Sequence, residues 1–146
     1  MKPLRILWQR VVDADGATCP RCQRTLAAIE RAMPELREAL QPLGFEPVLE
    51  SRAIDLATFQ GATAESNRIW IEGRALEDWL GARVGHSPCC ATCGDAECRT
   101  LEVGGASFDA IPAEFILRAA LMAAAQAGGS PATASACCAG SRGCPG

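Results

Sequence analysis

The stretch Thr18-Cys19-Pro20-Arg21-Cys22 joins a predicted strand to a predicted helix, and the rest of the chain is interpreted around it. Apolar residues typical of a strand run over 4–12, and a helical pattern runs over about 23–40. Two cysteines separated by two residues at a strand-to-helix junction are typical of a dithiol redox site. We therefore predict that the reactive residues of the protein lie at this junction.

The predicted position of Cys19 gives a physical reason for reactivity. At a helix start, backbone N–H groups without intrahelical partners and the helix dipole favour negative charge. A thiolate is both the nucleophile and the ligand for soft metals, so a lowered pKa makes such a site reactive. Arg21 and Arg24 add positive charge, and Pro20 suits the first helical turn. Cys19 is the predicted nucleophile and Cys22 the resolving thiol; half of a structural zinc site or a chance spacing are the alternatives.

Length, charge and composition exclude several classes of function. The chain has 146 residues with 49% hydrophobic and 21% charged residues, which fits one globular domain. Its net charge of -3 provides no basic surface for nucleic acid. The longest apolar run, 115–125, is too short to span a membrane, and no signal segment precedes the first strand. We therefore expect a cytoplasmic protein, in which nine cysteines favour metal binding or catalysis.

Hydrophobic periodicity predicts the remaining elements. The helix over 23–40 has one buried face, with a kink or a restart at Pro34. A second strand over 45–50 is expected to run parallel to the first, with Pro47 near a sheet edge. The elements expected after it are a short helix over 55–59, a strand over 68–72, a helical turn over 75–81, an irregular insertion over 85–98, a hairpin over 99–109 and a last helix over 113–127 that is covered on most sides.

The insertion over 85–98 contains the densest group of metal-ligand residue types. The two-residue spacing of Cys90 and Cys93 suits tetrahedral zinc, with Cys98 and either Cys89 or His86 completing four ligands. Both a structural zinc clip and a site that loads and unloads a soft ion fit this spacing. An iron–sulfur cluster fits poorly, because the usual spacing is different.

The end of the chain carries three more thiols behind a predicted flexible linker. Residues 128–136 are mainly Gly, Ser, Ala, Thr and Pro, and Cys137, Cys138 and Cys144 follow. The stretch Ala136-Cys137-Cys138-Ala139-Gly140 is similar to the C-terminal vicinal cysteine pair of mercuric ion reductases, which passes Hg(II) to a buried site. Soft thiolates select soft ions, and such a linker reaches roughly 15–18 Å. The alternative is an unstructured tail whose thiols are incidental.

The predicted order of elements is similar to the thioredoxin fold over roughly residues 4–127. That resemblance implies an α/β domain over 1–127, with a central mixed sheet flanked by helices, and a thiol-rich tail over 128–146. More closely, the chain resembles a small prokaryotic thioredoxin-like family, domain of unknown function 2703. The matching motifs are Cys19-Pro20-Arg21-Cys22, Glu65-Ser66-Asn67-Arg68-Ile69, Gly73-Arg74, Trp79-Leu80-Gly81, Ser87-Pro88-Cys89-Cys90, Cys93-Gly94-Asp95, Glu97-Cys98-Arg99 and Ala110-Ile111-Pro112-Ala113-Glu114.

One position departs from ordinary thioredoxins. Those proteins place a cis-proline immediately before the third strand, where it presents backbone to a peptide substrate and keeps metals off the dithiol. This chain has Ser66-Asn67 there. The departure argues against general protein-disulfide reduction and favours metal binding at Cys19 and Cys22.

These features predict a thioredoxin-like dithiol protein that exchanges disulfides or handles thiophilic ions such as Hg(II) or As(III). The dithiol needs no cofactor, whereas zinc or another soft metal ion is predicted at the Cys89–Cys98 cluster. The expected partners are a disulfide or soft-ion substrate and a cytosolic reductant, with neither nucleic acid nor membrane. The alternative is a non-catalytic zinc or soft-metal binding protein in which all the cysteine clusters are ligands.

Overall fold

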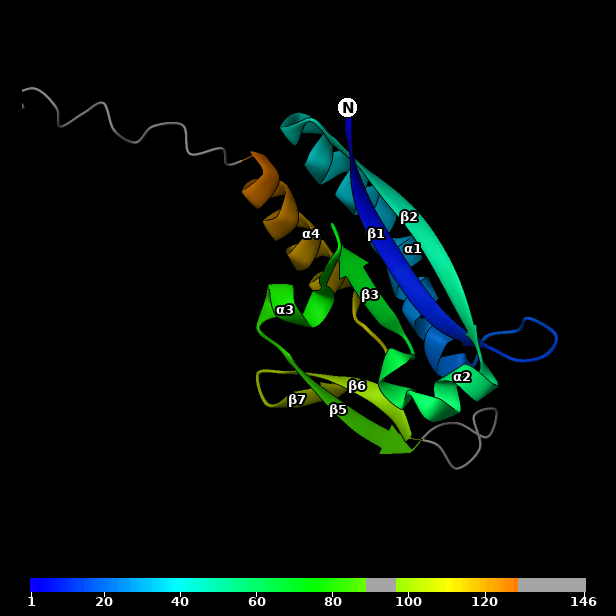
Figure 1. Cartoon of the computed structure of the whole chain (residues 1–146). Coiled ribbons are helices and arrows are strands. Elements are labelled where there is room, and N and C mark those ends of the chain that lie inside the picture. The colour runs from blue at the N-terminus through cyan, green and yellow to red at the C-terminus, as the bar shows by residue number, and fades with distance from the viewer. Residues whose placement is uncertain (89–96, 129–146) are drawn as a thin grey trace, which may run out of the picture.

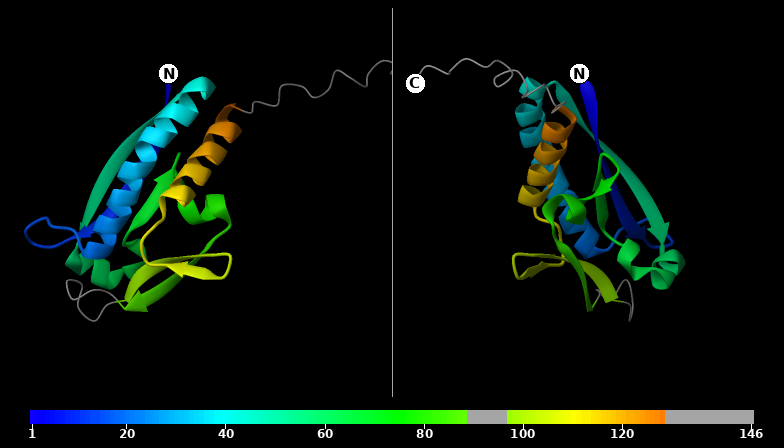
Figure 2. Two further views of the ribbon diagram at one scale, coloured as in Figure 1. Left: turned by 180° about the vertical axis from the view of Figure 1, so that it is seen from behind. Right: turned by 60° about the vertical axis from the view of Figure 1, so that its left-hand side comes forward.

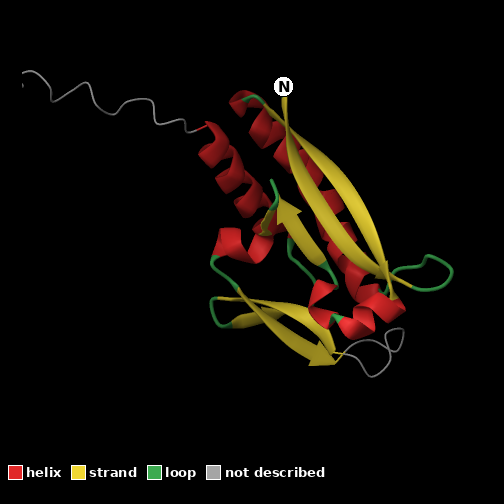
Figure 3. Ribbon diagram, viewed as in Figure 1, coloured by secondary structure: helices red, strands yellow, loops and turns green. Residues whose placement is uncertain are grey.

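The computed structural model describes residues 1–88 and 97–128 (Figure 1). These residues form an α/β structure with two sheets and two long helices (Figure 3). The described elements, in chain order, are β1 (Lys2–Val12), α1 (Pro20–Leu40), η1 (Gln41–Leu43), β2 (Phe45–Asp55), α2 (Leu56–Gly61), η2 (Thr63–Glu65), β3 (Arg68–Ile71), β4 (Arg74–Ala75), α3 (Leu76–Leu80), β5 (Arg83–Pro88), β6 (Glu97–Val103), β7 (Ala106–Phe108) and α4 (Ala113–Gly128).

The larger sheet has the strand order β2-β1-β3-β4. Strands β1 and β2 are parallel over their whole lengths, from Lys2 opposite Phe45 to Val12 opposite Asp55. Strand β3 is antiparallel to β1, and β4 is antiparallel to β3. Helix α1 provides the crossover that a parallel pair requires. The predicted parallel pair is confirmed, and so is the edge position of Pro47, because β1 is the only described strand that pairs with β2.

One face of this sheet forms the core with the two long helices. Leu4, Ile6 and Trp8 alternate along β1, are at most 1% exposed, and lie beside the buried Ile69 and Ile71 of β3. Helices α1 and α4 lie side by side against this face (Figure 2). Each fully buried large apolar side chain contributes about 1.5–3 kcal/mol. The fully buried large aliphatic residues of the two helices are Ile29, Leu36, Leu40 and Ile116.

The opposite face of the larger sheet has no described helix over its middle (Figure 1). Trp70 of β3 lies opposite Leu7 of β1 on this face, and both side chains are half-buried. The guanidinium groups of Arg68 and Arg52 lie 4.4 Å and 5.1 Å from the centroid of the Trp70 ring. Arginines stacked on an aromatic face cover apolar surface with their stems and gain cation–π attraction. Long polar side chains therefore cover part of this face in place of a helix.

The smaller sheet, β5-β6-β7, corrects the prediction of an irregular insertion and confirms the predicted hairpin. Residues 83–88 form strand β5, which is antiparallel to β6, so the prediction of irregular structure is wrong for 85–88 and 97–98. The hairpin is confirmed as β6–β7, with Gly104 and Gly105 at φ +58° and +82° in its turn. However, the hairpin pairs with β5 and does not join the larger sheet. Strand β5 lacks apolar alternation, and strand pairing with β6 outweighs its weak local propensity.

Gly85 shows how closely β5 and β6 approach. It lies opposite Thr100, and a Cβ atom at Gly85 would come within 2.7 Å of the Thr100 hydroxyl and 2.5 Å of a Glu102 carboxylate oxygen. A glycine in a strand commonly marks such a close approach. A larger residue at position 85 would therefore displace the side chains of Thr100 and Glu102.

Glu77 of α3 connects the two sheets. Its Oε1 lies 3.7 Å from Arg68 of β3 and also forms an ion pair with Arg99 of β6. Arg99 is 4% exposed, so its charge depends on this carboxylate for compensation. The ion-pair cluster fixes the smaller sheet relative to the larger one.

The two long helices differ from their predictions in detail. Helix α1 begins at Pro20 and continues through Pro34, so the predicted restart is wrong. The buried residues before and after Pro34 hold the helix against the sheet despite the missing N–H. Helix α4 is buried along one face only, since Leu121 and Met122 are 38% and 43% exposed, so the prediction that it is covered on most sides is wrong.

Among the helices of residues 1–88 and 97–128, none has the length and apolar character needed to span a membrane.

Candidate functional site

The loop between β1 and α1 is closed by its own hydrogen bonds, and it brings the dithiol to the end of β1. Asp13 Oδ1 accepts two main-chain N–H groups of the loop, and the Asp13 N–H donates to the Ala17 carbonyl at 2.9 Å. Gly16 adopts φ +81°, a conformation that suits glycine. The Thr18 hydroxyl then donates to the Val11 carbonyl at 2.8 Å. Cys19 therefore follows directly after a residue anchored to the sheet.

Cys19 is the N-cap of α1. Its backbone is extended (φ −69°, ψ 159°), Pro20 takes the first helical position, and Sγ accepts the Cys22 N–H at 3.5 Å. Both residues are thiols rather than a disulfide. They are 3% and 1% exposed, respectively. The structure thus brings the two predicted residues together at a helix start, within the core.

Cys22 is held in its protonated form. The hydrogen bond of its thiol with Cys19, followed by burial and the charge of Cys19, raises the pKa of Cys22 far above its ordinary value. Contacts with Val11 and Thr18 act in the opposite direction and are weaker. A pair with one proton between two sulfurs divides the roles: one sulfur can be a thiolate while the other remains a thiol.

This pKa shift predicts an alkaline loss of stability. Because the folded-state pKa of Cys22 is raised, the unfolded chain releases this proton at lower pH than the folded chain does. In reducing buffer, the stabilising contribution should be fully present below about pH 8.5 and fall as the pH rises further. Urea unfolding between about pH 7 and pH 10 measures it. Cys22→Ala should have a flatter profile than the wild type, and equal slopes in the two proteins would contradict the shift.

A buried hydrogen-bond network lies one helical turn beyond Cys22. Thr25 Oγ1 accepts from Asn67 Nδ2 at 2.9 Å and from the Ile111 N–H at 3.0 Å. Asn67 Oδ1 in turn accepts from Trp8 Nε1 at 3.1 Å. Asn67 adopts φ +49° immediately before β3, a conformation that asparagine tolerates. Asn67 therefore joins α1 to β1, and Thr25 joins α1 to the segment before α4.

Arg21 and Arg24, which both supply positive charge near the dithiol, lie in different environments. Arg24 is exposed and pairs with Asp109 at 2.9 Å. Arg21 is 8% exposed, and its Nη2 donates to the Pro88 carbonyl at 3.0 Å. This bond ties the first turn of α1 to the last residue of β5, immediately before Cys89 in the chain. No local pattern indicates this contact, because the two residues are 67 positions apart.

The structure describes only part of the predicted metal cluster. His86 is exposed on β5, whereas Cys98 on β6 is 2% exposed and disulfide-bonded. Within 1–88 and 97–128, no three His, Cys, Asp or Glu side chains converge on one point. A disulfide sulfur must be reduced before it can ligate a metal, so ion binding by Cys98 would require reduction first. The other predicted thiols lie outside the described residues, namely Cys89, Cys90 and Cys93 of the cluster and Cys137, Cys138 and Cys144 of the tail.

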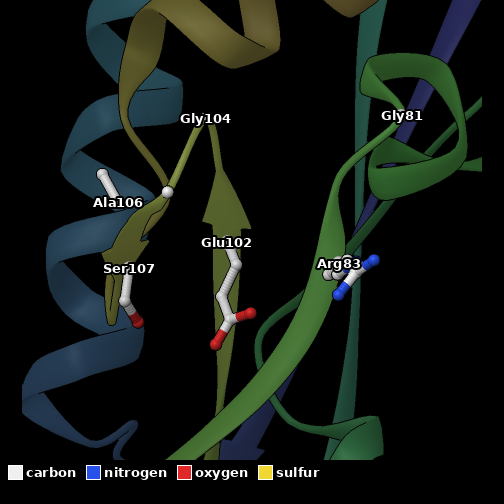
Figure 4. Close-up of a pocket in the computed structure, with 7 residues that line it drawn as sticks. Gly81, Arg83, Glu102, Gly104, Ala106 and Ser107 are labelled. Carbon is white, nitrogen blue, oxygen red and sulfur yellow. The ribbon is translucent and has the colours of Figure 1, made fainter.

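A surface pocket of about 410 Å³ lies apart from these residues, between the end of α3 and the β6–β7 hairpin. Figure 4 shows Glu102 between Arg83 and Ser107 in this pocket, with glycines at its upper rim. The residues that line it include no cysteine. The dithiol is therefore not reached through this pocket.

Together, the fold and the site define an α/β protein with a buried dithiol at the start of its first helix. The chain belongs to the family described as a domain of unknown function (DUF2703), whose model matches residues 4–120. It is similar to a protein of Archaeoglobus fulgidus described as an uncharacterized protein. The two are 43% identical over 113 residues, which make up 77% of this chain and 82% of the relative. No solved structure gives a significant match. The predicted membership of domain of unknown function 2703 is thus confirmed.

Proposed function

We propose that this protein is a thioredoxin-like dithiol protein that acts on disulfides or thiophilic ions, with Cys19 as the thiolate and Cys22 as the resolving thiol. One observation carries the proposal: Cys19 Sγ caps α1 and accepts the Cys22 N–H, while the Cys22 thiol is held protonated. A helix start favours the negative sulfur, and its neighbour stays a thiol until the second step, in which it gives up its proton.

The chemistry follows from these two protonation states. The Cys19 thiolate attacks one sulfur of a disulfide, the S–S bond breaks, and the leaving sulfur takes a proton from solvent. Cys22 then loses its proton and attacks the Cys19 sulfur, which releases the second half of the substrate. The product is a Cys19–Cys22 disulfide, which a cytosolic thiol reductant returns to the dithiol. With a soft ion that arrives as a complex with small thiolates, the Cys19 thiolate and then Cys22 bind the ion and displace two of those thiolates. The Cys22 proton passes to a departing thiolate, and no electrons are transferred.

The strand order supports the thioredoxin-like part of the proposal. A parallel β1-β2 pair joined by a helix that begins with the dithiol, and an antiparallel β3 on the other side of β1, give the expected order of elements around the site. Two features differ from an ordinary thioredoxin. Asn67 stands before β3, and no described helix covers the outer face of the larger sheet.

Burial of the two sulfurs favours a small substrate. Attack on a disulfide depends on access to the attacking thiol, and a bulky protein substrate cannot reach a thiol that is 3% exposed without movement of its neighbours. A soft ion needs only a narrow path and binds strongly to thiolates. Arg21 also places the residue before Cys89 beside α1, and Cys98 belongs to the same core as the dithiol. The burial of the two sulfurs therefore favours a small thiophilic ion such as Hg(II) or As(III) as the substrate, and it also supports the alternative of a non-catalytic metal-binding protein.

The redox equilibrium of the dithiol tests the proposal. The protein is equilibrated in buffers of defined thiol–disulfide ratio, then alkylated and analysed by peptide mass spectrometry. We expect Cys19 and Cys22 to form one reversible disulfide with a single midpoint. The control is the double variant Cys137→Ser/Cys138→Ser, which removes two tail thiols and should leave that midpoint unchanged. If no buffer produced a Cys19–Cys22 disulfide, the proposed thiol–disulfide exchange would be contradicted.

Metal stoichiometry separates the alternative from the exchange reaction. A non-catalytic metal-binding protein should carry stoichiometric metal after reduction and gel filtration, and Cys19→Ser should lower the metal count. If the tail relays the ion, deletion of residues 129–146 should slow the transfer of Hg(II) from a small thiol complex to the dithiol. An unchanged transfer rate would contradict a role for the tail.

A further inference from the structure

The outer edge of β2 is the longest strand edge without a partner among the described residues. Strand β2 runs over Phe45–Asp55 and pairs only with β1 within 1–88 and 97–128. Its middle residues, Ser51, Arg52 and Ala53, are exposed. An exposed edge of this length is a template for pairing with another strand.

The backbone direction of each β2 residue follows from the register. The Lys2 N–H donates to the Gly44 carbonyl at 3.0 Å, and the register between β1 and β2 is constant from Lys2 to Val12. Even-numbered residues of β2 therefore direct their N–H and C=O groups toward β1, and odd-numbered residues direct theirs outward. Pro47 is at an outward position, where its missing N–H costs no bond within the sheet. The residues that present both outward groups in the middle of the strand are Leu49, Ser51 and Ala53.

We propose that two copies of this chain pair through β2, antiparallel and about a two-fold axis at Ser51. In that register Ser51 lies opposite Ser51 of the second copy, and Leu49 lies opposite Ala53. These outward-facing residues form about six main-chain hydrogen bonds across the axis. The two larger sheets then become one continuous sheet.

The side chains on the outer face favour this register. Glu50 lies opposite Arg52 of the second copy, twice by symmetry, and Val48 lies opposite Ile54. Within its own chain Arg52 donates Nε to Gln9 Oε1 and stacks on Trp70, so Glu50 of the second copy would pair with the terminal nitrogens of the guanidinium. Val48 is 37% exposed and Ile54 is half-buried, so the pairing covers apolar surface. A two-fold axis at Glu50 would instead place Glu50 opposite Glu50, and like charges directly opposite are destabilising. The charges of β2 thus complement a second copy of the same strand.

The oligomeric state of the full chain tests the proposal. Light scattering after gel filtration, in a reducing buffer that excludes disulfide-linked dimers, should show a dimer that dissociates on dilution. Ser51→Pro should give a monomer, because it removes an outward N–H and leaves the bonds between β1 and β2 intact. Its circular dichroism and thermal unfolding should remain close to those of the wild type.

Charge exchange tests the register itself. Glu50→Arg should weaken the dimer about 10-fold or more, because it places arginines opposite each other. The double variant Glu50→Arg/Arg52→Glu should restore much of the affinity. A wild type that stays monomeric at several hundred micromolar would overturn the proposal. A dimer unaffected by both Ser51→Pro and Glu50→Arg would also overturn it, as would one abolished only by deletion of residues 129–146.

Discussion

Replacing Cys19 with serine is expected to abolish turnover of a small disulfide, with a rate loss on the order of 1,000-fold or more. A serine hydroxyl at the N-cap can still accept the Cys22 N–H, so the helix start should be preserved. It cannot supply a thiolate at neutral pH. The measurement is the rate of catalysed reduction of a small aromatic disulfide by excess reductant, with unfolding followed in parallel.

Cys22→Ser is the matched variant for this prediction. It leaves Cys19 in place and removes the resolving thiol, so a mixed disulfide on Cys19 should accumulate and be visible as a mass increase. Full activity of Cys19→Ser would place the nucleophile elsewhere. Equal accumulation of the mixed disulfide on both variants would mean that neither role is assigned correctly.

The dithiol at the helix start could be predicted because its signals are local. A cysteine before proline, with a second cysteine three positions later, defines an N-cap and the first helical turn within four residues. The parallel strands and the edge position of Pro47 were also accessible, since a helix between two strands implies a crossover. Each of these features depends on neighbours in the sequence.

The features that were not predicted depend on contacts between distant residues. Strand β5 has no apolar alternation, and its conformation comes from pairing with β6. Thr25 and Asn67 are separated by 42 positions, and Arg21 and Pro88 by 67. No periodicity in a single sequence indicates which polar residues meet in the core. The contacts that surround the dithiol could therefore not be predicted from the local sequence pattern.

Replacing Thr25 with valine is expected to give the largest loss of stability among substitutions that conserve side-chain volume. Thr25 is fully buried, and its hydroxyl accepts from Asn67 Nδ2 and the Ile111 N–H. Valine fills the same space and leaves both donors without an acceptor, at about 1–3 kcal/mol each. The free energy of unfolding should fall by about 2–6 kcal/mol, measured by urea denaturation of the reduced protein.

Thr25→Ser is the control, because it keeps the hydroxyl and removes only a methyl group, at about 1 kcal/mol. The order of stability should therefore be wild type, Thr25→Ser, then Thr25→Val. If the two variants were equally stable, the methyl group and not the hydroxyl would account for the loss. The hydrogen-bond network would then contribute little to the free energy of unfolding.

The same pair of variants connects stability to the reactive site. Thr25 lies one turn after Cys22 on α1, and its bonds hold that turn against the segments before β3 and α4. Loss of those bonds should increase local opening, so alkylation of the buried Cys22 should be faster in Thr25→Val than in Thr25→Ser under native conditions. Equal alkylation rates would show that access to the dithiol is controlled elsewhere, and the network would then stabilise the fold without gating its thiols.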